Sequence, residues 1–247
     1  MKPLTLAGLA ALAPLPLAAQ DAPRTTAEIE EVVREYLLAH PELIIESLEG
    51  YQAREANAAT ARAEAAVRRH WPQLKSAAYG NALGAEEDEA EVVIVEFFDY
   101  HCGYCRRAGD FVLDLAREDG VRVVFQDLPI LKEESRTAAL AGLAAGEQGS
   151  FEAVYRQLLR TSGTLDRKAI DQAVRRAGAK PLRQLDDAAA VARYDAKIAQ
   201  SEAIAEAMEV AGTPAFIIAS PNAERVVLVP GYGPDEIQRA VASLRER

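Results

Sequence analysis

Two cysteines are the residues of this chain whose type and spacing most clearly predict chemistry. Cys102 and Cys105 are its only cysteines, and a Gly-Tyr dipeptide separates them. They follow an apolar run and begin a helical pattern, so the free amides and dipole of that helix should stabilise a thiolate on Cys102. Cys105 lies one turn further along, where its thiol can attack a mixed disulfide formed by Cys102. The pair therefore predicts thiol–disulfide exchange, with Cys102 as an acidic attacking thiol that is open to solvent.

Two segments resemble the signatures of a known family. Residues 95–105, VEFFDYHCGYC, resemble the active-site segment of the DsbA-like thiol-disulfide oxidoreductases of bacteria, and residues 212–216, GTPAF, resemble their second signature. The resemblance implies a thioredoxin-like fold with an inserted helical domain. It also implies that Pro214 follows a cis peptide bond and that Thr213 and Pro214 contact the substrate beside the cysteines. The redox-active disulfide Cys102–Cys105 would then be the working group, with no further cofactor.

Glu96, Gly103 and Tyr104 are candidates for controlling the two thiols. Glu96 lies in an apolar run, and burial of a carboxyl raises its pKa. The resemblance implies that this acid exchanges a proton with the second cysteine; the alternative is an acid paired with a buried lysine or arginine. The resemblance also implies that Gly103 and Tyr104 tune the redox potential. They lack the histidine that the strongest oxidants of the family carry there, so we expect a milder oxidant.

Three basic side chains flank the cysteines. His101 is a candidate for tuning the redox pair by placing positive charge near the thiolate, and the alternative is a histidine exposed in the loop. For Arg106 and Arg107 we favour a solvated helix face over an effect on the thiol.

Other chemistry remains open for the cysteine pair. Two thiolates can hold a soft ion such as Cu(I), so a metal-handling thiol protein of the cell envelope is the alternative function. A closed zinc site is not expected, because it needs four ligands and only three histidines are available beside the cysteines and carboxylates. We therefore assign no metal ligands. A third interpretation, an assembly protein with incidental cysteines, is the least favoured.

The pattern of apolar residues around the cysteines predicts an α/β fold. Residues 92–98 form a nearly continuous apolar run, typical of a strand buried on both faces. A helical pattern over 108–115 and a second apolar run over 121–125 follow, which places the two strands parallel with a right-handed crossover. The remaining elements are a strand over 215–219, a return strand over 226–229 and a helix from Pro234 to about Leu244.

The domains follow from this order of elements. Residues 131–211 show helical faces without a convincing strand, so we interpret them as a helical insertion. The thioredoxin-like catalytic domain then comprises residues 79–130 and 212–247. Residues 79–90, rich in glycine and acid, are predicted to be a loop in front of this domain.

Residues 20–78 predict an N-terminal helical arm. Thr25 and Glu28 form a capping-box pattern, and Pro41 separates the first helix from a second one. Both helices carry apolar stripes that precede the catalytic domain, so we expect the arm to join two or more chains; the alternative is a helix packed on its own domain. In layout the chain resembles the suppressor-of-copper-sensitivity C-type proteins, which favours disulfide isomerisation or reduction.

The ends and charge of the chain predict where it works. Residues 1–19 have the layout of a secretory signal peptide, so we expect a periplasmic protein. The formal net charge of −10 argues against nucleic acid as a partner. The predicted partners are unfolded or misoxidised secreted proteins and a membrane redox partner, DsbB-like for an oxidase or DsbD-like for an isomerase.

Overall fold

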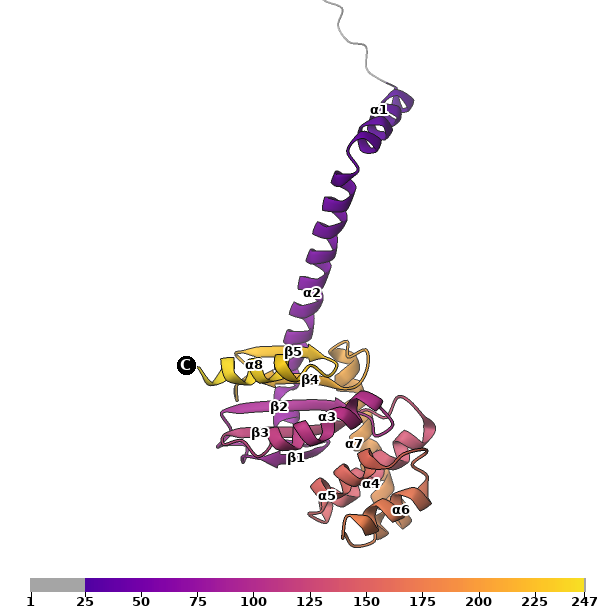
Figure 1. Cartoon of the computed structure of the whole chain (residues 1–247), viewed down its shortest axis with the longest axis vertical. Helices are drawn as coiled ribbons and strands as arrows, with labels where there is room; N and C mark the ends of the chain where they lie inside the picture. Colours follow the sequence, from indigo (N-terminus) through magenta and orange to yellow (C-terminus); the bar gives the residue numbers. More distant parts are fainter. Residues whose placement is uncertain (1–24, 247) are drawn as a thin grey trace, which may run out of the picture. The chain divides into compact units, whose positions relative to one another are not determined.

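A computed structural model describes residues 25–246 and divides the chain into two compact units, residues 1–56 and residues 57–247. The predicted signal peptide lies outside the described residues. Figure 1 labels the elements in chain order. Within residues 25–246 no helix is both long and apolar enough to cross a membrane.

The first unit holds α1 (Thr26–Ala39) and the beginning of α2 (Glu42–Lys75). The predicted capping box is confirmed: the Thr25 hydroxyl accepts from the Glu28 amide at 3.4 Å, and the Glu28 carboxylate accepts from the Thr25 amide at 2.7 Å. The break between the two helices at Pro41 is also confirmed.

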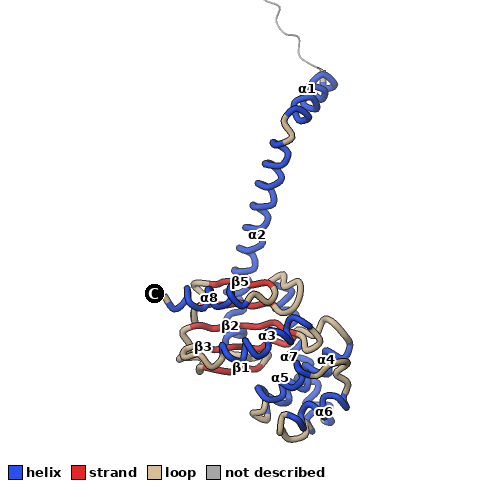
Figure 2. Tube along the Cα trace, in the orientation of Figure 1, coloured by secondary structure: helices blue, strands red, loops and turns tan. Residues whose placement is uncertain are grey.

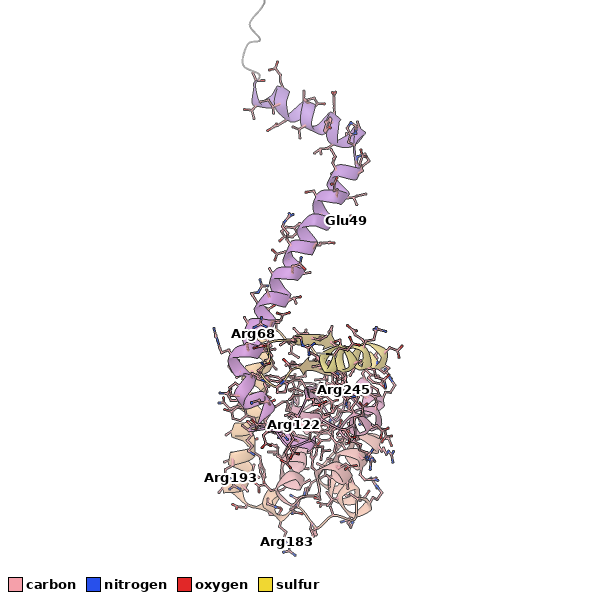
Figure 3. All side chains as sticks on the ribbon, turned by 90° about the vertical axis from the view of Figure 1, so that its left-hand side faces the viewer. Glu49, Arg68, Arg122, Arg183, Arg193 and Arg245 are labelled. Carbon is pink, nitrogen blue, oxygen red and sulfur yellow. The ribbon has the colours of Figure 1, made fainter. Side chains whose placement is uncertain are left out.

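The apolar side chains of this unit are exposed. Figure 3 draws them along the helices on either side of the break, with Glu49 labelled on α2. No residue of α1 is buried. The large apolar side chains are between 38% and 76% exposed: Ile29, Val32, Val33, Tyr36, Leu38, Leu43, Ile44, Ile45, Leu48 and Tyr51. Such a set is unusual on a chain that works alone, because contiguous exposed apolar surface marks an interaction site.

The second unit is built on a five-stranded sheet in the order β1-β3-β2-β4-β5 (Figure 1). β2 (Val92–Phe98) is its central strand, and all seven of its residues are buried. It pairs in parallel with β3 (Val121–Asp127), as the crossover pattern predicted. β4 (Ala215–Ala219) and β5 (Val226–Pro230) form the predicted antiparallel hairpin.

The prediction of a loop over 79–90 was wrong in part. Residues Asn81–Gly84 form the edge strand β1, which pairs antiparallel with β3. Glycine allows the close approach: a Cβ on Gly80 would collide with the carbonyl oxygen of Phe125, and Gly84 has a φ of +91°. The loop signal reflected these glycines, which here serve strand pairing instead of ending it.

Helices cover both faces of the sheet. In Figures 1 and 2, α3 (Gly103–Leu115) and α8 (Pro234–Arg245) lie in front of the strands. The opposite face packs on the end of α7 and on the last turns of α2, which bury Val67, Trp71 and Leu74. The Trp71 indole donates to the Pro221 carbonyl at 2.8 Å, and Arg122, labelled in Figure 3, donates to the Lys75 carbonyl at 2.9 Å. The end of α2 is therefore part of the core of the catalytic unit.

The helical insertion is confirmed between β3 and β4. It consists of α4 (Glu133–Glu147), α5 (Phe151–Arg160), α6 (Arg167–Arg176), a short 3-10 turn (Arg183–Asp186) and α7 (Ala188–Ala207). Its apolar faces continue the core on the α3 side of the sheet, through Tyr155 and Leu158 of α5. The predicted fold class, α/β with an inserted all-helical segment and N-terminal helices, is confirmed.

Candidate active site

Cys102 occupies the N-cap position of α3, after a short loop that leaves the central strand at Phe98. Its backbone is extended, and its sulfur accepts a hydrogen bond from the Cys105 amide at 3.4 Å. As a thiol it donates to the Thr213 carbonyl at 3.1 Å. Both cysteines are free thiols. The strand thus delivers Cys102 to the end of a helix, where the first amides have no partner within the helix.

The two thiols differ strongly in acidity. The pKa of Cys102 is lowered to about 5, first by a hydrogen bond from the Cys105 side chain, then by the Thr213 side chain and the amides of Cys105 and Tyr104. Burial opposes this effect. The pKa of Cys105 is raised far above its usual value, chiefly by burial. Near neutral pH the site therefore holds one thiolate and one thiol, which is the asymmetry that an attacking and a resolving cysteine require.

Cys102 is less open to solvent than the sequence predicted. Its residue is 5% exposed, whereas Cys105 has no exposure. The covering comes in part from the segment before β4, whose Thr213 carbonyl contacts the sulfur. A substrate sulfur must reach Cys102 past this segment.

Thr213 and Pro214 lie beside Cys102 in the structure. The peptide bond between them is cis, as the resemblance implied. The Pro214 carbonyl accepts from the Gly231 amide at 2.9 Å, which ties the segment to the end of β5. The Thr213 hydroxyl is buried and has no hydrogen-bond partner among the described residues, so it is available to the thiolate or to a bound chain.

A groove of about 710 Å³ begins at this segment. Its walls are the 208–214 segment, β5 with the turn that follows it, Tyr104, and three small residues of α2, Ala59, Thr60 and Ala63. The sequence places that stretch of α2 in the predicted arm and does not show that it shares a groove with Tyr104 and the Thr213–Pro214 segment. The four-residue spacing of small side chains at Ala59 and Ala63 is the only local signal, since it places both on one helix face.

Glu96 is fully buried in β2, and its partner is neither lysine nor arginine. The hydroxyl of Tyr155, from α5, donates to its carboxylate at 3.0 Å. Burial raises the pKa of Glu96 to about 8, although the Tyr155 hydrogen bond acts in the opposite direction. Asp127, at the end of β3, is a second buried acid that sequence analysis missed. Burial raises its pKa well above the usual value, and neither of its oxygens has a partner among the described residues.

His101 is neither exposed nor a source of charge, so both interpretations of this residue were wrong. Its side chain is 2% exposed, and burial lowers its pKa, which favours the neutral ring. Arg106 was also misjudged as solvated: its guanidinium donates to the carbonyls of Tyr100 at 3.2 Å and Thr161 at 2.7 Å. Arg107 is exposed as expected and lies 4.1 Å from the centre of the Tyr104 ring.

Within residues 25–246, no group of three or more histidine, cysteine, aspartate or glutamate side chains could hold a metal ion.

Comparison with known proteins decides the family. Residues 76–226, more than half of the chain, match the family model described as thioredoxin. The chain belongs to the thioredoxin family. Residues 26–58 match a second model, described as the copper resistance protein ScsC N-terminal domain. The arm and the catalytic unit therefore both have counterparts among known proteins, and the resemblance to the DsbA-like and ScsC-like oxidoreductases is confirmed.

Solved structures agree with this assignment. The thioredoxin-like oxidoreductase from Silicibacter pomeroyi is 35% identical, with 71% of this chain and 97% of that chain covered and a TM-score of 0.58. The catalytic domain of Proteus mirabilis ScsC is 22% identical, with 74% and 99% covered and a TM-score of 0.64. Salmonella enterica BcfH is 22% identical, with 89% and 95% covered and a TM-score of 0.69. The last two similarities show the fold.

Curated relatives match over shorter stretches. The Na(+)/H(+) antiporter NhaA 1 of Salinispora arenicola is 36% identical over 80 residues, which is 31% of this chain and 12% of that protein. NhaA 3 of Salinispora tropica is 32% identical over 133 residues, or 53% and 20%. The chain thus spans a fifth or less of the curated relatives it matches.

Proposed function

We propose that this protein is a thiol–disulfide oxidoreductase that exchanges disulfides with other proteins through Cys102 and Cys105. The observation that carries the proposal is the placement of the two thiols: Cys102 lies at the N-cap of α3, where its sulfur accepts from the Cys105 amide, and Cys105 is buried one turn inside. This placement lowers the pKa of Cys102 and raises that of Cys105. No cofactor beyond this pair is required.

The reaction follows from that asymmetry. The Cys102 thiolate attacks one sulfur of a substrate disulfide, forms a mixed disulfide and releases the other substrate sulfur as a thiolate. Cys105 then loses its proton and attacks the Cys102 sulfur. This step closes the Cys102–Cys105 disulfide and releases the second substrate thiol, so two electrons pass to the substrate. The reverse sequence oxidises a substrate dithiol.

Glu96 is the proposed proton acceptor for Cys105. The two groups interact, because the charge of Glu96 raises the pKa of Cys105. A carboxyl whose pKa is about 8 exchanges protons readily near neutral pH, which suits a group that must take a proton and return it in each cycle.

Gly103 and Tyr104 are the proposed tuning residues. Both are exposed between the cysteines, and neither brings a positive charge to the thiolate. We therefore propose a milder oxidant than relatives with histidine in this dipeptide.

The surroundings of Cys102 support unfolded polypeptides as substrates. Among the described residues of the second unit, the exposed large apolar side chains are Tyr104, Ile130 and Leu131. Tyr104 lies between the cysteines. Asp99 links Leu131, the neighbour of Ile130, to the catalytic loop by accepting from the amides of Leu131 at 3.0 Å and His101 at 2.8 Å. An unfolded chain offers the apolar side chains that such a surface and the groove at Thr213–Pro214 would bind.

We further propose a homo-oligomer formed through the exposed apolar residues of α1 and early α2. The match of residues 26–58 to the ScsC N-terminal domain supports an arm of that type. Several catalytic units on one assembly suit disulfide isomerisation in the periplasm, with a DsbD-like membrane reductase as partner. Val33→Asp with Ile44→Asp in the full chain should yield a monomer by light scattering and reduce isomerase activity while leaving insulin reduction intact. An oligomer unchanged by these charges would contradict the arm.

The same match supports one alternative, Cu(I) held by the two thiols, because the model is described as a copper resistance protein domain. Two thiolates are sufficient ligands for this soft ion.

Cysteine variants test the central proposal. Cys102→Ser should abolish insulin reduction and refolding of scrambled substrate. Cys105→Ser should attack once and accumulate a mixed disulfide with substrate, detected as a reducible adduct by mass spectrometry. Full activity of Cys102→Ser would exclude the mechanism.

A further inference from the structure

The catalytic loop is bound to the helical insertion on both sides of Cys102. On the side before it, the buried ring of His101 contacts two segments of the insertion. Its Nδ1 lies 3.0 Å from the Ser135 hydroxyl of α4, and its Nε2 accepts from the amide of Leu165 at 3.1 Å. Leu165 lies in the segment that joins α5 to α6.

These contacts fix the protonation of the ring. A backbone amide can only donate, so Nε2 carries no proton and acts as acceptor. The proton of a neutral imidazole is then on Nδ1, which donates to Ser135 and faces the Asp99 carboxylate at 3.9 Å. His101 therefore acts as a neutral two-sided connector.

Arg106 provides the connection on the other side of Cys102. Its Nε donates to the carbonyl of Tyr100, and its Nη1 donates to the carbonyl of Thr161, in the same α5–α6 segment. The Thr161 hydroxyl in turn accepts from Arg176 of α6 at 3.0 Å. The two side chains thus join residues 100–106 to residues 161–165 at two points, with Cys102 between them.

The position of Cys102 is sensitive to such support. Its sulfur accepts from the Cys105 amide at 3.4 Å, and this hydrogen bond is one of those that lower the pKa of Cys102. A small shift of the loop that lengthens this contact would remove part of the stabilisation of the thiolate.

We propose that His101 and Arg106 are positioning residues that hold Cys102 at the N-cap of α3 by fastening the catalytic loop to the 161–165 segment. This proposal rests on the proposed function, because it assigns to the helical insertion a role in keeping the attacking thiol ionised. It concerns the thiol itself, so it can be tested apart from turnover.

The test is a titration of the Cys102 thiolate by its absorbance at 240 nm in the full chain. His101→Phe keeps the size and burial of the ring but removes both hydrogen bonds. We expect the pKa of Cys102 to rise by about half a unit or more, and exchange of the Leu165 amide to accelerate about tenfold, the loss expected for one hydrogen bond. Arg106→Met should raise the pKa in the same direction and serves as the second variant if His101→Phe does not fold.

Tyr194→Phe is the matched control. The Tyr194 hydroxyl is buried in the insertion and donates to Glu147 at 2.5 Å, away from the catalytic loop. This variant should lose stability without changing the pKa of Cys102. The inference is overturned if His101→Phe and Arg106→Met lower stability as Tyr194→Phe does while the thiol titrates as in the wild type. If the wild type does not reduce protein disulfides but the pKa of its Cys102 still depends on His101, the result would count against the proposed function alone.

Discussion

Replacing Glu96 by glutamine should change how the stability of the fold depends on pH. Burial raises the pKa of Glu96 from 4.5 to about 8 in the folded protein. The folded state therefore holds this proton more tightly than the unfolded chain does. Its stabilising contribution is fully present below pH 4.5 and is lost as the pH rises toward and through 8.

The magnitude follows from the two pKa values. Since one pKa unit corresponds to about 1.4 kcal/mol, Glu96 should lower the free energy of unfolding by about 3 kcal/mol between pH 4 and pH 7 and by about 5 kcal/mol at pH 9. Glutamine cannot ionise and loses none of this. Its oxygen can still accept from Tyr155, but its amide nitrogen would stand where one carboxylate oxygen has no partner, at a cost of about 1–3 kcal/mol that is independent of pH.

Urea denaturation of wild type and Glu96→Gln at pH 4, 7 and 9 measures the effect. The difference between the two free energies of unfolding should move in favour of the variant as pH rises. Asp127 titrates in both proteins, so its contribution largely cancels in this difference. The exposed Glu133→Gln is the control and should show no such slope. A difference that stays constant with pH would refute a buried, proton-holding Glu96.

The same variant tests the proposed role in catalysis. Without its acceptor, Cys105 should resolve the mixed disulfide roughly 100-fold more slowly or slower still, while attack by Cys102 should be little changed. Single-turnover kinetics with a peptide disulfide separates the two steps.

Three further predictions concern the thiol pair. Thr213→Val removes a hydroxyl that is free to donate to the Cys102 thiolate and lowers its pKa, so the thiolate titration should shift upward by about one unit; an unchanged titration would exclude a contribution of the hydroxyl. Tyr104→His adds a potential positive charge next to the thiolate and should make the protein more oxidising in a glutathione equilibrium, whereas a wild type already as oxidising as DsbA would contradict the milder potential. Cu(I) competition titrations should show tight binding that either cysteine-to-serine variant abolishes if the copper alternative holds, and no binding by the reduced wild type would exclude it.

The chemistry of the site could be predicted from sequence because it depends on neighbours in the chain. The spacing of Cys102 and Cys105, the apolar run before them and the helical pattern after them are local, and together they placed an acidic thiol at a helix N-cap. The parallel pairing of β2 with β3 also followed from a local strand–helix–strand order. The second signature at Thr213–Pro214 was recognised by resemblance, and its place beside Cys102 is a long-range contact.

What the tertiary structure decided are contacts between segments far apart in the chain. His101 and Arg106 have sequence contexts typical of solvent-exposed loop and helix residues. In the structure, segments 34 to 64 residues away in the chain accept or donate hydrogen bonds to both side chains. The sequence pattern indicated only that Tyr155 lies on the apolar face of a helix, but its hydroxyl donates a hydrogen bond to Glu96, which is 59 residues away in the chain. The sequence predicted that the last turns of α2 belong to the arm, yet Trp71 packs into the core of the catalytic unit. The periodicity of apolar residues indicates which side of a helix or strand is buried. Which polar group a buried side chain will contact depends on which elements pack together, and the packing of the whole domain determines this.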